Sequence, residues 1–228
     1  MKTIGILAGM GPRSTSPFLE LVLDQCQKQY GAKDDIDFPD IIIYSLPTPF
    51  YLDRPINHEE LKNTIVKGLK RLESFDVSFI AIPCNTAHKY YEKLASEIEV
   101  PLLNIIKETI NYIPESKKVT LFGTESTRKS GLYQDQFNTR GYEYIFKESW
   151  QHQINELISM VKSGENPEKR NLKWNELKEN IIAEGVDTVV IACTDLNVVL
   201  QSTKSKERLN FVDSSEALAK AVIREYLK

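Results

Sequence analysis

Short apolar runs recur along the chain, separated by stretches long enough to form a helix. Each run has the length of a strand and is bounded by Gly, Pro, Ser or other polar residues. The pattern predicts strands at 3–8, 40–45, 77–82 and 101–105, and a second series at 117–122, 142–146, 187–192 and 209–213. Because strands that alternate with helices form parallel sheets, we expect an α/β fold.

The stretches between the strands carry apolar residues three and four positions apart, which is the period of an amphipathic helix. Leu61, Ile65, Leu69 and Leu72 form one such series. The pattern predicts helices at 14–30, 59–74, 86–97, 127–140, 152–163, 171–184 and 214–227.

The two series of elements resemble each other, which indicates an internal duplication. TIGILAGMGPRST (3–15) parallels KVTLFGTEST (118–127), and IAIPCNT (80–86) parallels VVIACTD (189–195). We therefore expect two similar lobes related by a pseudo-two-fold axis, each with a roughly four-stranded, mainly parallel sheet flanked by helices. The first lobe would span 1–108 and the second 109–211, and the terminal helix at 212–228 could pack back on the first lobe.

Composition narrows the classes of partner. A chain of 228 residues with a net charge of −3 lacks the basic surface that nucleic acid or an anionic membrane would need, so a small molecule is the expected partner. No run approaches the roughly 18 apolar residues of a membrane span. The opening MKTIGILAGMGPR predicts a strand and not a signal peptide, and three cysteines in such a chain indicate thiols in a reducing cytoplasm.

Cys84 and Cys193 each follow an apolar strand, at the edge where parallel sheets bind their ligands. The start of a helix lowers the pKa of a thiol, and small polar residues such as Asn85 and Thr194 can cap that helix or bind a ligand. If the carboxyl edges of the two lobes face each other, both thiols reach one cleft. A thiolate on one face of a substrate and a thiol on the other could then move a proton. Cys26 has no counterpart in the second half, and we expect it in the core.

Other interpretations of the cysteines remain open. Buried cysteine is often only a packing residue, and two nearby thiols could instead form a redox pair. Cys84 and His88, four residues apart, could make a Cys-His nucleophile, although a packing or surface histidine fits as well. Without a CxxC or HxxxH motif, the scattered histidines His58, His88 and His152 do not predict a metal site.

The glycine-rich turn GILAGMGPRS does not match a dinucleotide-binding fingerprint. Pro12 interrupts the motif, Ser14 takes the place of its third small residue, and no acidic residue ends the second strand. The turn could simply join a strand to a helix, or its backbone N–H groups could hold a carboxylate.

Three segments, MGPRST, PCNTAH and ACTDLNVVL, resemble the aspartate/glutamate racemase family over essentially the whole chain. The resemblance implies two α/β lobes with the active site between them, commonly in a homodimer, and two-base racemisation without pyridoxal phosphate or any other cofactor. Cys84 and Cys193 would be the two acid/base residues. The remaining substrate contacts would come from Met10, Gly11, Asn85, Thr86, Thr124 and Thr194.

Two basic residues indicate which amino acid is the substrate. Arg54, in an Asp-Arg pair, and Lys162, in VKSG (161–164), resemble the residues with which aspartate racemases hold the side-chain carboxylate. Asp195 departs from the family, in which glutamate is commoner after the Cys-Thr pair. The resemblance thus implies a racemase that interconverts L- and D-aspartate.

Several alternatives remain open at this stage. Within the family, a glutamate or broad-specificity racemase would use the same thiols, and a one-base enzyme acting on small dicarboxylates would need only one of them. A non-catalytic thiol redox sensor is the alternative from a different class of protein.

Overall fold

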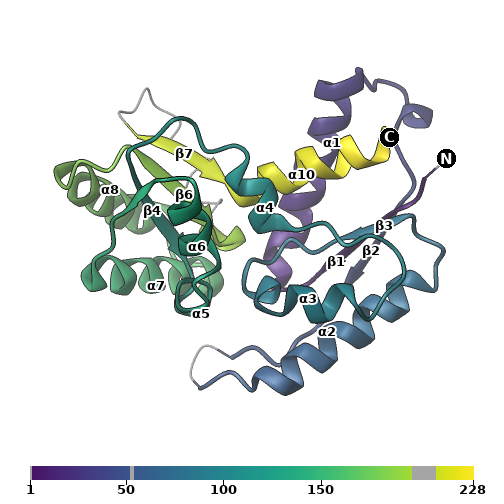
Figure 1. The fold of residues 1–228 in the computed structure, drawn as a ribbon, viewed down its shortest axis with the longest axis horizontal. Coiled ribbons are helices and arrows are strands. Elements are labelled where there is room, and N and C mark those ends of the chain that lie inside the picture. The colour runs from purple at the N-terminus through teal and green to yellow at the C-terminus, as the bar shows by residue number, and fades with distance from the viewer. Residues whose placement is uncertain (1, 52–53, 197–208) are drawn as a thin grey trace. The chain divides into compact units, whose positions relative to one another are not determined.

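The structure, a computed structural model, describes residues 2–51, 54–196 and 209–228. The chain divides into two compact units, Met1–Glu108 with Ser215–Lys228, and Thr109–Ser214. Each unit contains a parallel sheet flanked by helices (Figure 1), which confirms the predicted α/β class. Among the described residues, no helix has both the length and the apolar character needed to cross a bilayer.

The sheet of the first unit has three parallel strands in the order β2-β1-β3. Their bounds are β1 (Ile4–Ala8), β2 (Ile41–Ser45) and β3 (Phe79–Ala81). Both neighbours of β1 run parallel to it, with Ile4 opposite Ile41 on one side and Phe79 on the other. The carboxyl ends of all three strands therefore meet at one edge of the sheet.

The fourth strand predicted for this lobe, at 101–105, is wrong. Only Leu102 forms a bridge, to Ile80. The chain cannot continue as a strand because the Asn104 side chain accepts hydrogen bonds from the N–H groups of Ile106 and Lys107, at 3.0 and 3.1 Å. These bonds cap a helix, α4 (Ile105–Ile110), that the apolar pattern did not reveal.

The helices of the first unit cover its sheet. They are η1 (Pro12–Ser14), α1 (Thr15–Tyr30), η2 (Asp35–Asp37), α2 (His58–Glu73), η3 (Thr86–Tyr90), α3 (Tyr91–Ala95), α4 and α10 (Ser214–Tyr226). The helix predicted at 86–97 is a 3-10 turn followed by five α-helical residues. The apolar series of α2, Leu61, Ile65, Leu69 and Leu72, is buried, as the helical period predicts.

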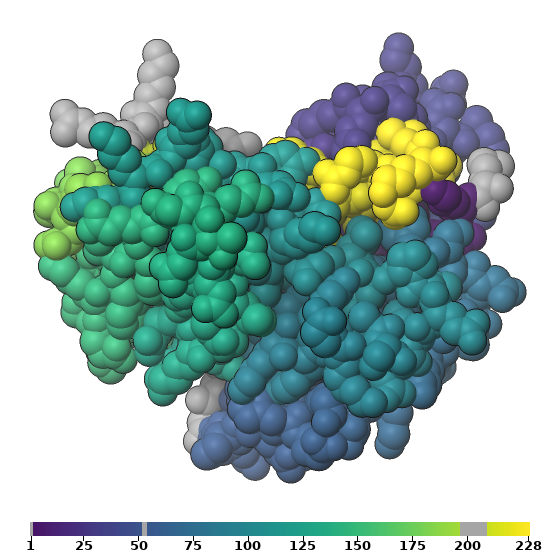
Figure 2. All heavy atoms as spheres, viewed as in Figure 1, coloured from purple at the N-terminus to yellow at the C-terminus, as the bar shows by residue number. Residues whose placement is uncertain are grey.

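The last helix, α10, lies against the beginning of the chain, where Figure 2 shows its yellow atoms beside purple ones. Lys2 Nζ donates to the carbonyl of Glu225 at 2.8 Å, and the Gln29 amide donates to the carbonyl of Lys220 at 3.1 Å. The Tyr30 and Tyr226 rings are in contact, with centroids 6.3 Å apart. These contacts attach the end of the chain to α1 and the first strand.

The sheet of the second unit has the four predicted strands, in the order β5-β4-β6-β7, and every neighbouring pair is parallel. The strands are β4 (Lys118–Gly123), β5 (Glu143–Tyr144), β6 (Thr188–Ala192) and β7 (Asn210–Asp213). The helical segments are α5 (Glu125–Lys129), α6 (Leu132–Thr139), α7 (Glu148–Ser163), α8 (Pro167–Ala183) and η4 (Thr194–Leu196). The helix predicted at 127–140 is split at Gly131, whose φ of 76° is the left-handed conformation that glycine adopts readily.

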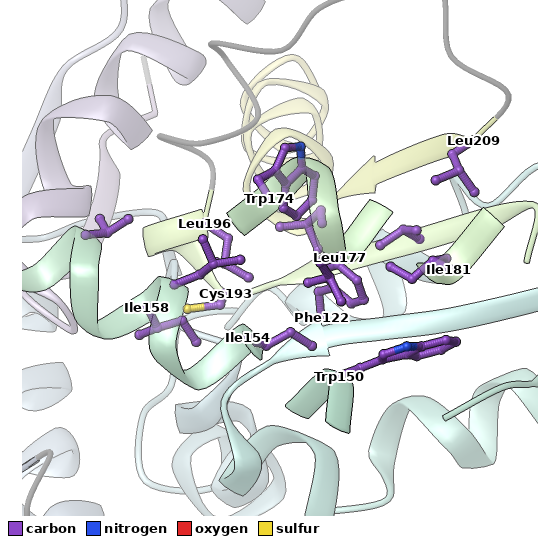
Figure 3. Packing of buried hydrophobic residues seen from close by; sticks show 14 of the residues in the cluster. Phe122, Trp150, Ile154, Ile158, Trp174, Leu177, Ile181, Cys193, Leu196 and Leu209 are labelled. Carbon is purple, nitrogen blue, oxygen red and sulfur yellow. The ribbon is translucent and has the colours of Figure 1, made fainter. Parts of the chain in front are cut away.

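One face of this sheet packs against α7 and α8, and their side chains form the core seen in Figure 3. Trp174 of α8 is fully buried and meets Phe122 of β4 edge to face, with ring centroids 5.8 Å apart. Cys193 belongs to this cluster. The core therefore reaches the end of β6, where the sequence places a thiol.

Candidate functional site

Each of the two cysteines follows a strand and joins the apolar cluster beside it. In both units the residues four and two positions before the cysteine are buried and pack in the same cluster as the cysteine. The two series are Ile80, Ile82 and Cys84, and Val189, Ile191 and Cys193. The duplication seen in the sequence therefore extends to the packing of each cysteine with the apolar residues before it.

In the first unit, Cys84 is half-buried at the end of the segment that follows β3. Its backbone N–H donates to the carbonyl of Ile82 at 2.8 Å, which bends the chain before η3 begins. Asn85, at the N-cap position of η3, and Thr86, its first residue, are both buried. Because η3 is a short 3-10 turn, it aligns fewer peptide dipoles towards the thiol than the predicted long helix would.

His88 holds this segment in place through backbone partners at both of its ring nitrogens. Its ring is only 2% exposed. Nδ1 lies 2.8 Å from the backbone carbonyl of Cys84, and Nε2 accepts the N–H of Ile105 at 3.2 Å. A neutral imidazole with its proton on Nδ1 satisfies both bonds. Burial lowers the pKa of His88, outweighing the carbonyls of Cys84 and Leu103, which act in the opposite direction.

This role of His88 was not predicted from the sequence. The four-residue spacing between Cys84 and His88 in PCNTAH could have indicated it, because a side chain at that spacing can reach the carbonyl one helical turn earlier.

A tyrosine lies near the thiol of Cys84. The pKa of Tyr90 is raised, first by burial and then by the charge of Cys84. The Tyr90 hydroxyl is hydrogen-bonded to Nδ1 of His58, whose Nε2 lies 3.3 Å from Lys89 Nζ. A polar chain of three side chains therefore leads from the surface to the neighbourhood of Cys84.

The other predicted residues of the first unit follow neighbouring strands. Met10 packs against the same apolar cluster as Cys84, and the carbonyl of Gly11 accepts the hydroxyl of Ser14 at 2.7 Å. Arg54 is exposed, and its guanidinium stacks over the ring of Tyr51 at 4.4 Å. The structure thus brings Met10 and Cys84 to one cluster and leaves Arg54 on the surface.

In the second unit, Cys193 follows β6 and is 7% exposed, beside Ile158 and Leu196 in Figure 3. Thr194, the next residue, is also buried. Gly123 of β4 pairs with Ala192 of β6, so the residues after them, Thr124 and Cys193, leave adjacent strands at the same level.

The hydroxyl of Thr124 caps α5. It accepts the N–H of Thr127 at 3.1 Å.

Lys162 and Asp195 form an ion pair in the second unit. Lys162 lies in the last turn of α7, and Asp195 lies in η4, two residues after Cys193. Lys162 Nζ is 3.2 Å from Asp195 Oδ2. The lysine predicted to hold a substrate carboxylate is therefore in contact with a carboxylate of the chain itself.

Some predicted features fall outside the described part of the chain, namely Asp53 and the last four residues of ACTDLNVVL, 197–200. Within the described part, all three cysteines are thiols, and Cys26 is fully buried, as predicted. The same part of the chain contains no group of three or more His, Cys, Asp and Glu side chains that could hold a metal ion.

Comparison with known proteins identifies the family of the chain. Residues 7–222 match the family model described as Asp/Glu/Hydantoin racemase. The chain is 48% identical over 225 residues to the broad-specificity amino-acid racemase RacX of Bacillus subtilis, covering 98% of each protein. It is 27% identical over 154 residues to a glutamate racemase of Persephonella marina, covering 65% of this chain and 58% of that one.

Solved structures share the two-unit fold. The aspartate racemase of Picrophilus torridus superposes with a TM-score of 0.79 at 27% identity, over 99% of this chain and 94% of that one. The match of the family model over nearly the whole chain and the 48% identity to a racemase point to the same family as the two cysteine motifs. The chain therefore belongs to the Asp/Glu/Hydantoin racemase family of isomerases.

Proposed function

We propose that this racemase interconverts the L and D enantiomers of amino acids without a cofactor, with Cys84 and Cys193 as its two acid/base groups. One cysteine, as the thiolate, removes the α-proton from one face of the substrate. The other, as the thiol, delivers a proton to the opposite face. In the reverse reaction the two cysteines exchange roles, so both enantiomers are substrates.

The observation that carries this proposal is the matched placement of the two thiols. Each follows the carboxyl end of a strand in a parallel sheet and packs in the same apolar cluster as the buried residues two and four positions before it. A packing cysteine has no need of such a counterpart. A two-base reaction needs one acid/base group for each face of the substrate, and a duplicated fold supplies one from each half.

The reaction also needs fixed donors, because the α-proton of an amino acid is far less acidic than a thiol. Asn85 and Thr86 in the first unit and Thr194 in the second are buried polar residues next to the two cysteines. We assign them, with Met10 and Gly11 after β1 and Thr124 after β4, to the groups that all amino acids share, the α-carboxylate and the α-ammonium.

The range of substrates has two candidates. A broad range is favoured by the 48% identity to a broad-specificity racemase. Aspartate as the main substrate is favoured by Arg54 and Lys162, in which case both cations would hold its side-chain carboxylate. We propose the broad range as the function that the site supports best.

Exchange of the α-proton in deuterated water tests the two-base scheme. Without added cofactor, the native protein is expected to racemise its amino-acid substrates. Deuterium from the solvent should enter at the α-carbon whichever enantiomer is supplied. Cys84→Ser and Cys193→Ser are each expected to abolish racemisation. Each variant retains one of the two proposed acid/base thiols, so any residual deuterium exchange should be confined to one enantiomer, and to opposite enantiomers in the two variants. Full racemisation by either variant would contradict the scheme.

Cys26→Ala is the matched control, because it removes the third thiol of the chain from a fully buried position in α1. This variant is expected to retain racemisation and exchange from both enantiomers. A redox sensor, the alternative from another class, would instead turn over none of the amino acids and would form a Cys84–Cys193 disulfide under mild oxidation.

A further inference from the structure

One flank of α7, which carries Gln151, Asn155 and Lys162, runs along the edge of the second unit's sheet where β4 and β6 end. Near the beginning of α7, the amide of Gln151 donates to the carbonyl of Gly123, the last residue of β4, at 3.0 Å. Near its end, Lys162 Nζ lies 3.2 Å from the carboxylate of Asp195, which follows β6. Because parallel strands bind ligands at their carboxyl ends, these two contacts place the flank between them beside a ligand-binding edge.

Asn155 lies between the two contacts. It is four residues after Gln151 and seven before Lys162, and these spacings keep the three side chains on one side of a helix. Lys162 is about 10 Å further along the helix axis. Asn155 is exposed, whereas Ile158, one turn after it, is buried beside Cys193 (Figure 3). The amide of Asn155 is therefore accessible to a ligand one helical turn from the residue that packs beside the second thiol.

The hydrogen bonds around Gln151 determine which way the amide of Asn155 points. Arg128 Nε can only donate, and it donates to Gln151 Oε1 at 3.1 Å. The amide nitrogen of buried Gln151 donates in turn to the Gly123 carbonyl and, at 2.9 Å, to Asn155 Oδ1. The oxygen of Asn155 thus faces Gln151, and its NH2 group, which carries the N–H donors, is at the other end of the amide.

We propose that Asn155 is a specificity-determining residue, which donates a hydrogen bond to an oxygen atom in the side chain of the substrate, and that Gln151 is the positioning residue that orients it. The inference rests on the proposed racemase function and names a substrate class of that site, the amino acids whose side chain carries an oxygen. The residues beside the two cysteines are already assigned to the α-carboxylate and the α-ammonium. An amide has no net charge, so it can bind a carbonyl or hydroxyl oxygen as well as a carboxylate.

L-Asparagine and L-leucine are the best pair of probes, because their side chains branch at the same atom and have nearly the same size, and only asparagine carries an oxygen. The quantity to measure is the ratio of kcat/KM for L-asparagine to that for L-leucine, from exchange of the α-proton in deuterated water. Asn155→Ala is expected to lower this ratio about fivefold, the effect of losing one hydrogen bond. Alanine is the best helix former, so the substitution should leave α7 intact.

Two further variants separate the donor from other roles of these amides. Asn155→Asp keeps the size of the side chain and the oxygen that faces Gln151 but removes the donors, so it is expected to lower the ratio as much as alanine does. Its added charge affects both probes alike, because neither has a charged side chain. Gln151→Met removes the donor that orients Asn155 and should also lower the ratio, whereas a purely structural role would weaken both substrates equally and would overturn the positioning role.

Asn175→Ala is the matched control, because Asn175 is exposed on α8 and loses the same amide. It is expected to leave the ratio at the native value.

The outcomes separate this inference from the function beneath it. An unchanged ratio in an active Asn155→Ala variant overturns the inference, while the racemase function stands. An equal loss for both probes also overturns it, since Asn155 would then bind a group that all amino acids share. A native ratio in Asn155→Asp would show that no donor is needed and would overturn it too. If the native protein exchanges the α-proton of neither probe nor of other amino acids, the proposed function itself fails.

Discussion

Replacing His88 by phenylalanine tests whether this buried ring holds the Cys84 segment in place. Phenylalanine keeps an aromatic ring, slightly larger than imidazole, that can stack on Tyr91, whose ring centroid lies 5.8 Å away. It removes the donor to the Cys84 carbonyl and the acceptor for the Ile105 N–H. The substitution leaves no cavity, so any loss comes from the missing hydrogen bonds and from fitting the slightly larger ring.

The expected loss follows from those two bonds. Removing the partner of a buried backbone group costs about 1–3 kcal/mol, so His88→Phe is expected to lower the free energy of unfolding by about 2–4 kcal/mol. For a chain of this length, that corresponds to a fall in Tm of roughly 5–15 °C. Because the Cys84 carbonyl belongs to the proposed acid/base residue, racemisation should fall as well, at temperatures where the variant remains folded.

The pH dependence gives a second, independent signature. Since burial lowers the pKa of His88, the folded chain binds a proton at this site less readily than the unfolded chain does. This contribution to stability is therefore complete above the unfolded pKa of about 6.5. It is lost as the pH falls towards the folded pKa, with a slope of up to about 1.4 kcal/mol per pH unit. His88→Phe should remove this slope and leave a smaller dependence on pH between 7 and 5.

Urea unfolding followed by far-UV circular dichroism is the assay, repeated between pH 7.5 and 5. Tryptophan fluorescence is the wrong probe, because both tryptophans, Trp150 and Trp174, lie in the second unit and His88 lies in the first. His152→Phe is the control, since His152 is exposed on α7 and its replacement should change stability by no more than about 0.5 kcal/mol. A His88→Phe variant with native stability and the native pH slope would refute the reasoning.

Two further predictions concern the backbone around each sheet. Gly9→Ala should lower the free energy of unfolding by about 2 kcal/mol or more, as measured by chemical denaturation. The reason is that φ of Gly9 is +91° and that a Cβ at this position would lie 2.5 Å from the Leu46 carbonyl oxygen. Asp187→Asn should cost about 1–2 kcal/mol near neutral pH, since the carboxylate accepts the N–H groups of Lys117 and Lys118. Burial would raise the pKa of Asp187, but these hydrogen bonds outweigh it and lower the pKa. The difference from the native protein should therefore shrink as the pH falls below about 4, where the unfolded carboxyl group becomes protonated.

Local patterns in the sequence were enough to predict seven of the eight strands. β1, β4 and β6 carry long apolar runs in which every strand residue, or all but one, is buried. The failure at 101–105 came from Asn104, whose side chain can end a strand by capping the next helix. An apolar run and a capping residue make opposite predictions there, and the tertiary fold favours the cap.

The residues that surround the cysteines were harder to predict, because their partners are distant in the sequence. The cysteines themselves stood out through the repeat and through their position after a strand. His88 reaches Ile105, and Lys162 reaches Asp195, across a helix or more of intervening chain. Periodicity reveals which face of an element is buried, but not which polar side chains meet once the elements have packed.

Both units place a cysteine in a corresponding position, but the residues around the two cysteines differ. Both units place a cysteine after a strand, in the apolar cluster formed by the residues before it, as the proposed two-base reaction would require. Beyond the thiol, the first unit uses His88 to tie the Cys84 carbonyl to the start of α4, and the second uses Asp195 to engage Lys162. An amino acid has the same groups at its reacting carbon whatever its side chain, so proton transfer needs a matched pair. The side chain lies to one side of that carbon, and a charge that reads it has no reason to be duplicated. A change at either cysteine should therefore stop racemisation of every amino acid that the protein accepts, whatever its side chain.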